Sequence, residues 1–268
     1  MDIKATADEL EAGRGYDALF VPALFAPWPA KLIAAARVEK DQTVLDIACG
    51  SGVLTRALQA AVGPGGRAIG LDPAPGMLAA AAEHLPDAEW VLAPAEALPM
   101  GEATFDAVLC QFGMMFFKDR QGAAAEMLRV LKPQGSLAVA VWNALDHNPA
   151  YRDIVALLDA HLGRDAGDAV RMPFNLGDAA ALCGVFEAAG FAAVSAQTLS
   201  EPARFPSPRV MVEAELRGWL PLFGISLDEP AIAALLEKAD QVLAGYRDAD
   251  GAAAFATSAH IVTARKPG

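Results

Sequence analysis

The segment 44–62 constrains the fold more strongly than any other part of the chain. Residues 44–48 form a short β-prone run, residues 49–52 read Cys-Gly-Ser-Gly, and residues 53–62 repeat apolar side chains at helical spacing. A strand that turns through glycines directly into a helix is typical of α/β sheets, and ligands bind where the turn meets the helix. The segment therefore predicts an α/β fold with a ligand site at residues 46–52.

Strand-like and helix-like segments alternate along the first half of the chain. Strands are predicted at residues 44–48, 67–71, 89–92, 105–111 and 136–142, and helices at residues 53–62, 73–85 and 123–131. Such alternation is typical of a mostly parallel sheet with helices on both faces. Two further strands, at 192–199 and 255–265, complete a predicted Rossmann-like, doubly wound α/β fold with a seven-stranded sheet and helical cap insertions.

The segments around this sheet are predicted to belong to a single domain of residues 1–268. Residues 1–40 are expected to form N-terminal lid helices, and residues 41–143 the cofactor-binding core. Residues 144–177 and 201–250 are expected to form helical cap segments, with a loop at 164–177. Asp178 is a plausible N-cap for a helix that ends at Gly190.

Charge and cysteine usage narrow the class of partner. The chain has 21 Lys and Arg against 33 Asp and Glu, a net charge of −12. This balance disfavours nucleic acid and anionic membranes, which attract clustered cations. No apolar run approaches the ~18–20 residues of a spanning helix, and residues 1–13 lack the pattern of a signal peptide. We expect a cytoplasmic protein with a small-molecule partner; homodimerisation is left open. The three cysteines lack metal-ligand spacing, so no metal site is expected.

The polar residues beside the glycine turn argue against a dinucleotide ligand. The dinucleotide pattern Gly-x-Gly-x-x-Gly requires a third glycine where this chain has Thr55. A carboxylate at Asp46 would repel a phosphate, but it would favour a ligand with an ammonium and a sulfonium group. Asp72 ends the second strand, where a carboxylate can accept ribose hydroxyls or cap the next helix. Met77 lies just beyond, where it could pack on adenine or equally in the core.

Six segments, in order, resemble the motifs of class I S-adenosylmethionine-dependent methyltransferases. Residues 44–52 read Val-Leu-Asp-Ile-Ala-Cys-Gly-Ser-Gly, and the other segments are residues 70–72, 95–99, 105–108, 111–117 and 129–133. Together they are most similar to the ubiquinone/menaquinone-biosynthesis-like branch, which methylates small molecules. The resemblance is strong over residues 44–142 and implies S-adenosylmethionine as cofactor and S-adenosylhomocysteine as product. It does not specify the acceptor.

The resemblance also implies roles for individual residues around the cofactor. Those expected to surround its methionine and ribose parts are Asp46, Ala48, Gly50, Gly52 and Asp72, with Ala95 and Glu96 against the adenine and Gln111 and Phe112 at the methionine end. Pro94 departs from the family pattern, which has an acidic residue there that contacts the adenine amino group. Recognition of adenine would then depend on nearby peptide groups and Glu96.

Aromatic residues mark the expected acceptor side. Tyr16 falls where the family has a lid residue, and Phe20, Phe116 and Trp142 are expected on or near the acceptor pocket, although Phe20 fits the core equally well. Such a lining suits a small, apolar or aromatic acceptor.

A general base is needed only if the acceptor carries a proton that must be removed. His147 follows the fifth strand and is a candidate base, although a surface histidine without function is the favoured interpretation. Tyr16, Tyr151 and Asn143 are weaker alternatives.

The sequence therefore predicts an enzyme that transfers a methyl group from S-adenosylmethionine to a small acceptor by in-line displacement. Two alternatives stay open. A catalytically silent, methyltransferase-like binding subunit would keep the fold without turnover, and Pro94 and the lack of a clear base leave room for it. A nicotinamide-dependent oxidoreductase would use the same fold, but Thr55 disfavours it.

Overall fold

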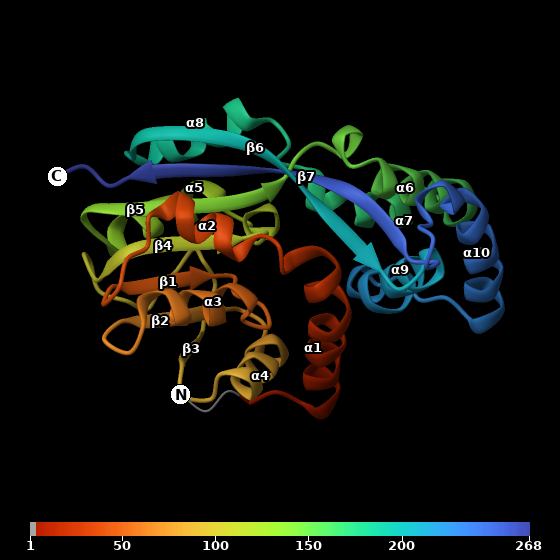
Figure 1. The fold of residues 1–268 in the computed structure, drawn as a ribbon, viewed down its shortest axis with the longest axis horizontal. Coiled ribbons are helices and arrows are strands. Elements are labelled where there is room, and N and C mark those ends of the chain that lie inside the picture. The colour runs from red at the N-terminus through yellow and green to blue at the C-terminus, as the bar shows by residue number, and fades with distance from the viewer. Residues whose placement is uncertain (1–3) are drawn as a thin grey trace.

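A seven-stranded sheet lies at the centre of the computed structural model, which describes residues 4–268 (Figure 1). The strands are β1 (Thr43–Ile47), β2 (Arg67–Asp72), β3 (Glu89–Leu92), β4 (Phe105–Gln111), β5 (Leu131–Trp142), β6 (Ala192–Phe205) and β7 (Ala253–Arg265). Their order across the sheet is β3-β2-β1-β4-β5-β7-β6. Only β7 pairs antiparallel with its neighbours, β5 and β6, and the remaining pairs are parallel. The predicted Rossmann-like fold is confirmed.

Helices cover both faces of the sheet. The helices beside it are α2 (Pro29–Ala36), α3 (Val53–Val62), α4 (Pro75–His84), α5 (Arg120–Val130) and α8 (Ala179–Ala189). Helix α2 packs against α3 on one face, and α5 packs against α8 on the other (Figure 1). The strands between them are continuously apolar, as expected for strands that are buried on both faces. In β4 and β5, for example, residues 107–110 and 137–141 are fully buried.

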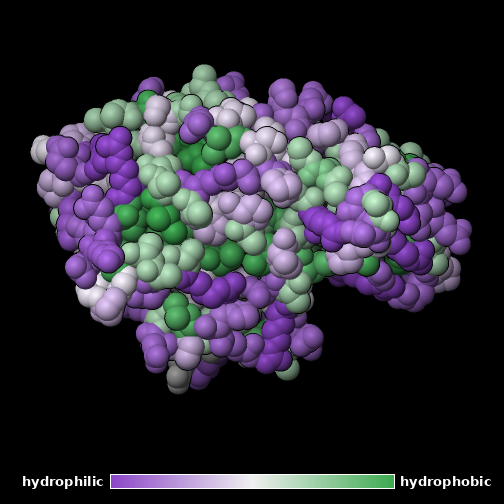
Figure 2. All heavy atoms as spheres, in the orientation of Figure 1, coloured by the Kyte–Doolittle hydropathy of each residue, from purple (hydrophilic) through white to green (hydrophobic). Residues whose placement is uncertain are grey.

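The remaining helices lie at one end of the sheet. They are α1 (Ala7–Phe20), α6 (Pro149–Leu162), α7 (Arg164–Arg171), α9 (Pro208–Ala214) and α10 (Glu229–Val242), with π-helical turns η1 (Val21–Phe25) and η5 (Glu215–Trp219). Short 3-10 turns η2 (Met114–Phe116), η3 (Leu145–His147), η4 (Met172–Phe174), η6 (Leu220–Phe223) and η7 (Ala244–Tyr246) connect the elements. The parallel strands point toward α1 and these cap helices (Figure 1). We call helices α6, α7, α9 and α10, with the turn η5, the cap. The outline of the molecule is indented between α1 and the cap (Figure 2).

The segment 164–177 was predicted as a loop, and that prediction is wrong. Helix α7 occupies Arg164–Arg171 and is followed by η4. Arg171 forms ion pairs with Asp159 and Asp168, while Ala166, Ala169 and Val170 are buried on one side. The ion pair within the helix, the ion pair with α6 and the buried side stabilise a short helix whose polar sequence and glycines had favoured a loop. The predicted N-cap at Asp178 is confirmed, since its carboxylate accepts from the amides of Ala180 and Ala181.

Two strands, β5 and β6, are longer than predicted by five and six residues. β5 begins at Leu131 rather than at 136, and β6 continues to Phe205 rather than ending at 199. The antiparallel pairing of β6 with β7 runs from Ala192 to Phe205 and carries Pro202 at the sheet edge, where no ladder donor is required. Among the described residues, no single helix is long and apolar enough to cross a membrane. The helical segments 7–25 and 29–36 meet that criterion jointly but are bent by 65°.

Candidate functional site

The carboxyl ends of β1, β2 and β4 lie where the strand order reverses. We call this region the strand mouth; it comprises residues 46–52, 72–77 and 111–113. Ligands of doubly wound sheets bind at this switch point. Asp46, in β1, is fully buried, and its Oδ2 accepts a hydrogen bond of 2.6 Å from the Thr55 hydroxyl. Thr55, which stands where a dinucleotide motif has glycine, thus fixes the carboxylate. Burial raises the pKa of Asp46 to about 7.

The turn after β1 adopts backbone conformations that few residues tolerate. Ala48, Gly50 and Gly52 have positive φ angles of 56°, 53° and 83°. A Cβ atom at Gly52 would lie 2.7 Å from the Trp90 ring, whereas a Cβ atom at Gly50 would meet nothing within 4 Å. Gly52 is therefore required by packing, while Gly50 borders open space. Ala48, which precedes both glycines, is a non-glycine residue at positive φ, and functional sites tend to hold such unusual backbone conformations.

Asp72 ties β2 to this turn. Its Oδ2 accepts from the Gly50 amide at 2.9 Å, and its Oδ1 accepts from the Ala74 amide at 2.8 Å. Helix α4 begins at Pro75 without a side-chain cap, so Asp72 does not act as its N-cap. Each carboxylate oxygen can accept a second bond, which leaves capacity for two hydroxyl groups. Burial raises the pKa of Asp72. Met77, two residues inside the helix, is half-buried.

The end of β4 presents an amide and an aromatic ring. The Gln111 Nε2 donates to the Phe25 carbonyl at 3.4 Å, while its buried Oε1 has no partner. Phe112 has a positive φ of 55° and stacks on Trp142, with ring centroids 3.8 Å apart and planes within 14°. Trp28 and Phe25 pack on the same two rings. These four aromatic side chains form an apolar wall beside the strand mouth.

The loop after β3 is held by helix α5. The Arg129 guanidinium donates to the carbonyls of Leu98 and Met100, and the Leu98 amide donates to the Glu126 carboxylate. Ala95 is buried, and one oxygen of Glu96 accepts from the amides of Lys118 and Asp119. That oxygen of Glu96 is therefore already used within the protein. Pro94 is exposed, so it offers no buried polar group.

Two unpartnered acceptors test whether the strand mouth suits an amino-acid-like nucleoside. Asp46 Oδ1 and Gln111 Oε1 are buried side-chain atoms without a hydrogen-bond partner. Buried polar groups normally have partners, so two orphaned acceptors on neighbouring strands indicate a missing donor. An ammonium group supplies several donors and a positive charge, which matches a carboxylate and an amide oxygen. The residues of the strand mouth therefore fit the methionine end of S-adenosylmethionine.

Helix α1 closes over the strand mouth. Gly13 lies so close to α4 that a Cβ atom there would be 2.6 Å from the Gly76 carbonyl oxygen. The Asp17 carboxylate pairs with His84 at 2.9 Å and with Arg56 at 3.4 Å. Tyr16 is half-buried, and burial together with the nearby charge of Asp72 raises the pKa of its hydroxyl. His84, at the C-terminal end of α4, thus helps to hold α1 in place.

The predicted acceptor-side residues fall in different places. Trp142 belongs to the aromatic wall, and Phe20 packs edge-on against the buried ring of Phe205, with centroids 6.0 Å apart. Phe116 is 43% exposed and contacts Trp219 of η5 rather than the wall.

The candidate bases are also separated. His147 is exposed on η3, whereas Asn143 is buried and bonded to Ser258 and to the Ala144 amide. Tyr151, a weaker sequence candidate, is buried in the first turn of α6.

Sequence reasoning missed Glu215, a buried carboxyl group at the start of η5 that is near enough to Tyr151 to influence its pKa. Glu215 is 5% exposed, and burial raises its pKa to about 8. Burial and the neighbouring carboxyl group raise the pKa of Tyr151 as well. A glutamate within a polar-looking cap segment gave no sign of burial; a perturbed acid is nevertheless a mark of functional sites.

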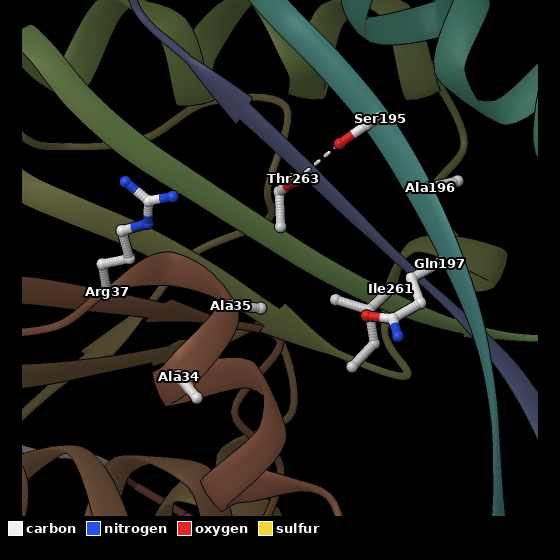
Figure 3. Close-up of a pocket in the computed structure, with 8 residues that line it drawn as sticks. All are labelled: Ala34, Ala35, Arg37, Ser195, Ala196, Gln197, Ile261 and Thr263. Carbon is white, nitrogen blue, oxygen red and sulfur yellow. Dashed lines mark hydrogen bonds between the residues drawn. The ribbon is translucent and has the colours of Figure 1, made fainter.

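A surface hollow of about 300 Å³ lies elsewhere (Figure 3). It is lined by residues of α2, β6 and β7 together with Arg37, and none of the residues of the strand mouth borders it. Arg37 and Gln197 are its largest polar side chains, and the Ser195 hydroxyl is bonded to Thr263 across the two strands. Within residues 4–268, no group of three His, Cys, Asp or Glu side chains gathers to hold a metal ion.

Comparison with known proteins gives relatives for the part of the chain that contains the strand mouth. Residues 45–139 match a family model described as a methyltransferase domain. The 2-phytyl-1,4-naphtoquinone methyltransferase of Thermosynechococcus vestitus is 36% identical over 115 residues, which cover 42% of this chain and 51% of the relative. The ubiquinone/menaquinone biosynthesis C-methyltransferase of an Enterobacter species is 39% identical over 118 residues, 42% of this chain and 47% of the relative. The chain thus spans about half the length of these curated relatives.

A solved structure extends the likeness of the fold. Phosphoethanolamine N-methyltransferase 2 of Haemonchus contortus, in complex with S-adenosyl-L-methionine, has a TM-score of 0.58. It is 18% identical and covers 98% of this chain, which covers 58% of that chain. At this identity the likeness concerns the fold alone.

Proposed function

Because the chain carries a class I S-adenosylmethionine-dependent methyltransferase domain, we propose that it methylates a small, apolar or aromatic acceptor. The observation that carries the proposal is the pair of orphaned acceptors, Asp46 Oδ1 and Gln111 Oε1, at the strand mouth. They lie on adjacent strands beside Asp72, which has capacity for ribose hydroxyls.

Each element of the strand mouth has a distinct task in this proposal. Asp46 and Gln111 accept from the ammonium group of the cofactor, and Asp72 accepts from its ribose. The open space beside Gly50 lets the ligand approach the backbone closely. The loop around Ala95 faces the adenine through peptide groups, because Glu96 already accepts from two amides. When bound, S-adenosylmethionine supplies an electrophilic methyl group on a positively charged sulfur.

The aromatic wall and the lid enclose the acceptor. Helix α1 is fastened to α3 and α4 through Asp17, and its Tyr16 stacks on Phe25 at a centroid distance of 5.6 Å. An enclosed, apolar surrounding excludes water and aligns the acceptor with the methyl group. The name of one curated relative states a naphthoquinone, and the name of the other assigns it to ubiquinone and menaquinone biosynthesis. An aromatic acceptor suits the wall formed by Phe25, Phe112 and Trp142.

A cytoplasmic location is part of the same proposal. The three cysteines are free and lie in different elements, as is usual where thiols stay reduced. A small molecule rather than nucleic acid is the proposed partner, since acidic side chains exceed basic ones by 12.

Calorimetric titration tests the cofactor assignment. We expect S-adenosylmethionine and S-adenosylhomocysteine to bind and NAD not to bind. Asp72→Ala removes a charged acceptor and should weaken binding by about 10–100-fold, because such hydrogen bonds contribute about 1.5–3 kcal/mol. Saturable binding of NAD without affinity for S-adenosylhomocysteine would contradict the proposal.

A methyl-transfer assay distinguishes an enzyme from a catalytically silent binding subunit. Transfer of a radiolabelled methyl group to members of a panel of phenols, quinols and amines is the expected result. Tight binding of S-adenosylhomocysteine without transfer to any member would favour a binding subunit.

A further inference from the structure

The polar groups of the strand mouth are buried inside the protein. Asp46 and Asp72 are both buried, and so are the unpartnered oxygens Asp46 Oδ1 and Gln111 Oε1. A ligand that bonds to these atoms is enclosed by protein on several sides. An element that covers the carboxyl ends of the strands therefore has to move before the cofactor can enter or its product can leave.

Helix α1 is the covering element with the least buried packing. Only Gly13 is buried among its residues, Ala7–Phe20, whereas α6 has the same length and buries six residues. Buried apolar surface is the main source of packing stability, so an element with little of it separates from the protein at low cost. Its C-terminal end continues into the π-helical turn η1, and the chain bends by 65° before α2. We infer that α1 moves about η1.

Side-chain ion pairs hold α1 against the cofactor-binding core. Arg14 donates from Nε to Glu83 of α4 at 3.0 Å. The Asp17 carboxylate lies 2.9 Å from His84 Nε2 of α4 and 3.4 Å from the Arg56 guanidinium of α3. The Asp17 side chain is 15% exposed, so water screens its contacts less than at an open surface. The closed position of α1 is thus held largely by electrostatic contacts, with Asp17 shared between two helices.

Arg56 carries this contact on to the cofactor-binding turn. Its guanidinium donates from one terminal nitrogen to Asp17 at 3.4 Å and from the other to the Ser51 carbonyl at 2.8 Å. Ser51 belongs to the glycine turn after β1, in which the Gly50 amide donates to the Asp72 carboxylate. A guanidinium is planar and rigid, so its two ends are positioned together. One side chain therefore connects α1 to the turn that also holds the ribose-binding carboxylate.

We propose that Asp17 and Arg56 are positioning residues that couple the closure of α1 to the cofactor-binding turn. In this proposal, separation of Asp17 from Arg56 is the step that admits the cofactor and releases its product. With α1 closed, Asp17 fixes the guanidinium that holds the Ser51 carbonyl in place. The inference rests on the proposed function and adds to it the residues that control exchange of the cofactor.

The two rate constants of ligand exchange distinguish this role from a purely structural one. If α1 has to open for entry and for release alike, weaker contacts at Asp17 increase the open population of the free and of the bound protein. The association and dissociation rate constants then rise together, and the equilibrium affinity hardly changes. A residue that only shapes the binding site would alter dissociation and affinity together instead.

Stopped-flow fluorescence with S-adenosylhomocysteine and the full chain measures both rate constants. Trp28 and Trp142 in the aromatic wall provide the signal. Asp17→Asn keeps the size of the side chain but loses its charge, and it should raise both rate constants by about fivefold, because exposed to half-buried ion pairs contribute about 1 kcal/mol or less. Its equilibrium affinity should stay within about twofold of the wild type.

A double-mutant cycle tests whether Asp17 acts through Arg56. Arg56→Lys keeps the positive charge but cannot bridge Asp17 and the Ser51 carbonyl as a rigid fork, so it should also raise both rate constants. The double variant should exchange the ligand no faster than the faster single variant, because both substitutions break the same contact. Fully multiplicative effects would show that the two residues act independently and would overturn the coupling.

Glu11→Gln is the matched control, because it removes one negative charge from the same helix. The Glu11 side chain is 78% exposed, and its recorded ion pair is with Arg14 of α1 itself. Its two rate constants should equal those of the wild type. Arg14→Gln removes the ion pair to α4 and should raise both rate constants by a smaller factor, which keeps the test available if Asp17→Asn does not fold.

Unchanged rate constants in both Asp17→Asn and Arg14→Gln would overturn the inference. So would faster dissociation with a matching loss of affinity and no change in association. If the wild type binds S-adenosylhomocysteine and either result is found, the inference fails and the proposed function stands. If the wild type does not bind S-adenosylhomocysteine, the proposed function itself fails.

Discussion

The strand mouth and the cap differ in how their polar residues are distributed along the chain. At the strand mouth, Asp46, Gly50 and Gly52 lie within residues 46–52, and the Asp72 carboxylate accepts directly from the Gly50 amide. In the cap, Tyr151 and Glu215 come from helices far apart in the sequence, and tertiary packing buries both of them. A ligand that is bound through backbone turns leaves a contiguous pattern in the sequence, whereas a ligand that is bound between helices leaves none.

The same difference extends to how each region fixes its acids. Thr55 and two backbone amides hold Asp46 and Asp72, so these carboxylates are set by local structure. Glu215, in contrast, is affected mainly by the burial that the cap imposes, which raises its pKa. Substitutions that alter the backbone should therefore affect stability and ligand binding at the strand mouth. In the cap, stability should depend on pH.

The largest expected effect is on the pH dependence of stability in the cap. Glutamate ionises near pH 4.5 in the unfolded chain, but Glu215 keeps its proton up to about pH 8 in the folded protein. Between these values the folded state binds more protons, so the free energy of unfolding falls as the pH rises. Glu215→Gln removes this loss and should stabilise the protein by about 3–5 kcal/mol at about pH 9, but little at about pH 4. Urea unfolding at the two pH values measures the difference. An equal effect at both would show that Glu215 is not buried as an acid.

Substitution of the two glycines of the turn should affect different properties: Gly52 is needed for stability and Gly50 for ligand binding. Gly52→Ala forces a Cβ atom to within 2.7 Å of Trp90 at a positive φ, and should destabilise the fold by about 2–4 kcal/mol. Gly50→Ala meets open space, so it should cost about 1 kcal/mol of stability while its methyl group obstructs the ligand. Thermal unfolding and calorimetric titration with S-adenosylhomocysteine distinguish the two. If Gly50→Ala bound the cofactor product as tightly as the wild type does, the ligand would not lie beside this turn.

The smallest effect concerns the proton on Asp46. Burial raises the pKa of this carboxyl to about 7, and an incoming ammonium group favours its ionised form. Binding of S-adenosylhomocysteine should therefore release a proton, and its affinity should fall by up to about tenfold per pH unit below neutrality. Calorimetry in two buffers with different ionisation enthalpies counts the proton. Asp46→Asn should release none, and a wild type that releases none would place the ammonium group elsewhere.

Much of the strand mouth could be predicted because its chemistry is local. The strand–turn–helix order fixes where Asp46 and Asp72 lie, and the alternation of strands and helices fixes the sheet. Thr55 shows the limit of such reasoning: the missing glycine was noticed, but the hydrogen bond to Asp46 needs three-dimensional placement. Likewise, nothing in the sequence around His84 indicates that it pairs with Asp17 of the lid.

The cap could not be predicted because burial there is a tertiary property. Glu215 is followed by charged and aromatic residues in a segment with several prolines, and such a segment suggests a solvated helix. In the fold this position is the first residue of a π-helical turn, and it is buried there. Helix α7 escaped prediction for the same reason, since its ion pair with Asp159 and its packing lie outside its own sequence.

The most direct test of the account is the affinity of S-adenosylhomocysteine for three proteins measured side by side by calorimetry: the wild type, Asp72→Asn and Glu215→Gln. Asp72→Asn keeps the size of the side chain but loses its charge, and we expect a loss of about tenfold or more. Glu215→Gln alters the cap alone and should bind within about twofold of the wild type. Equal affinities for the wild type and Asp72→Asn, or no binding by the wild type, would contradict the assignment of the strand mouth as the cofactor site.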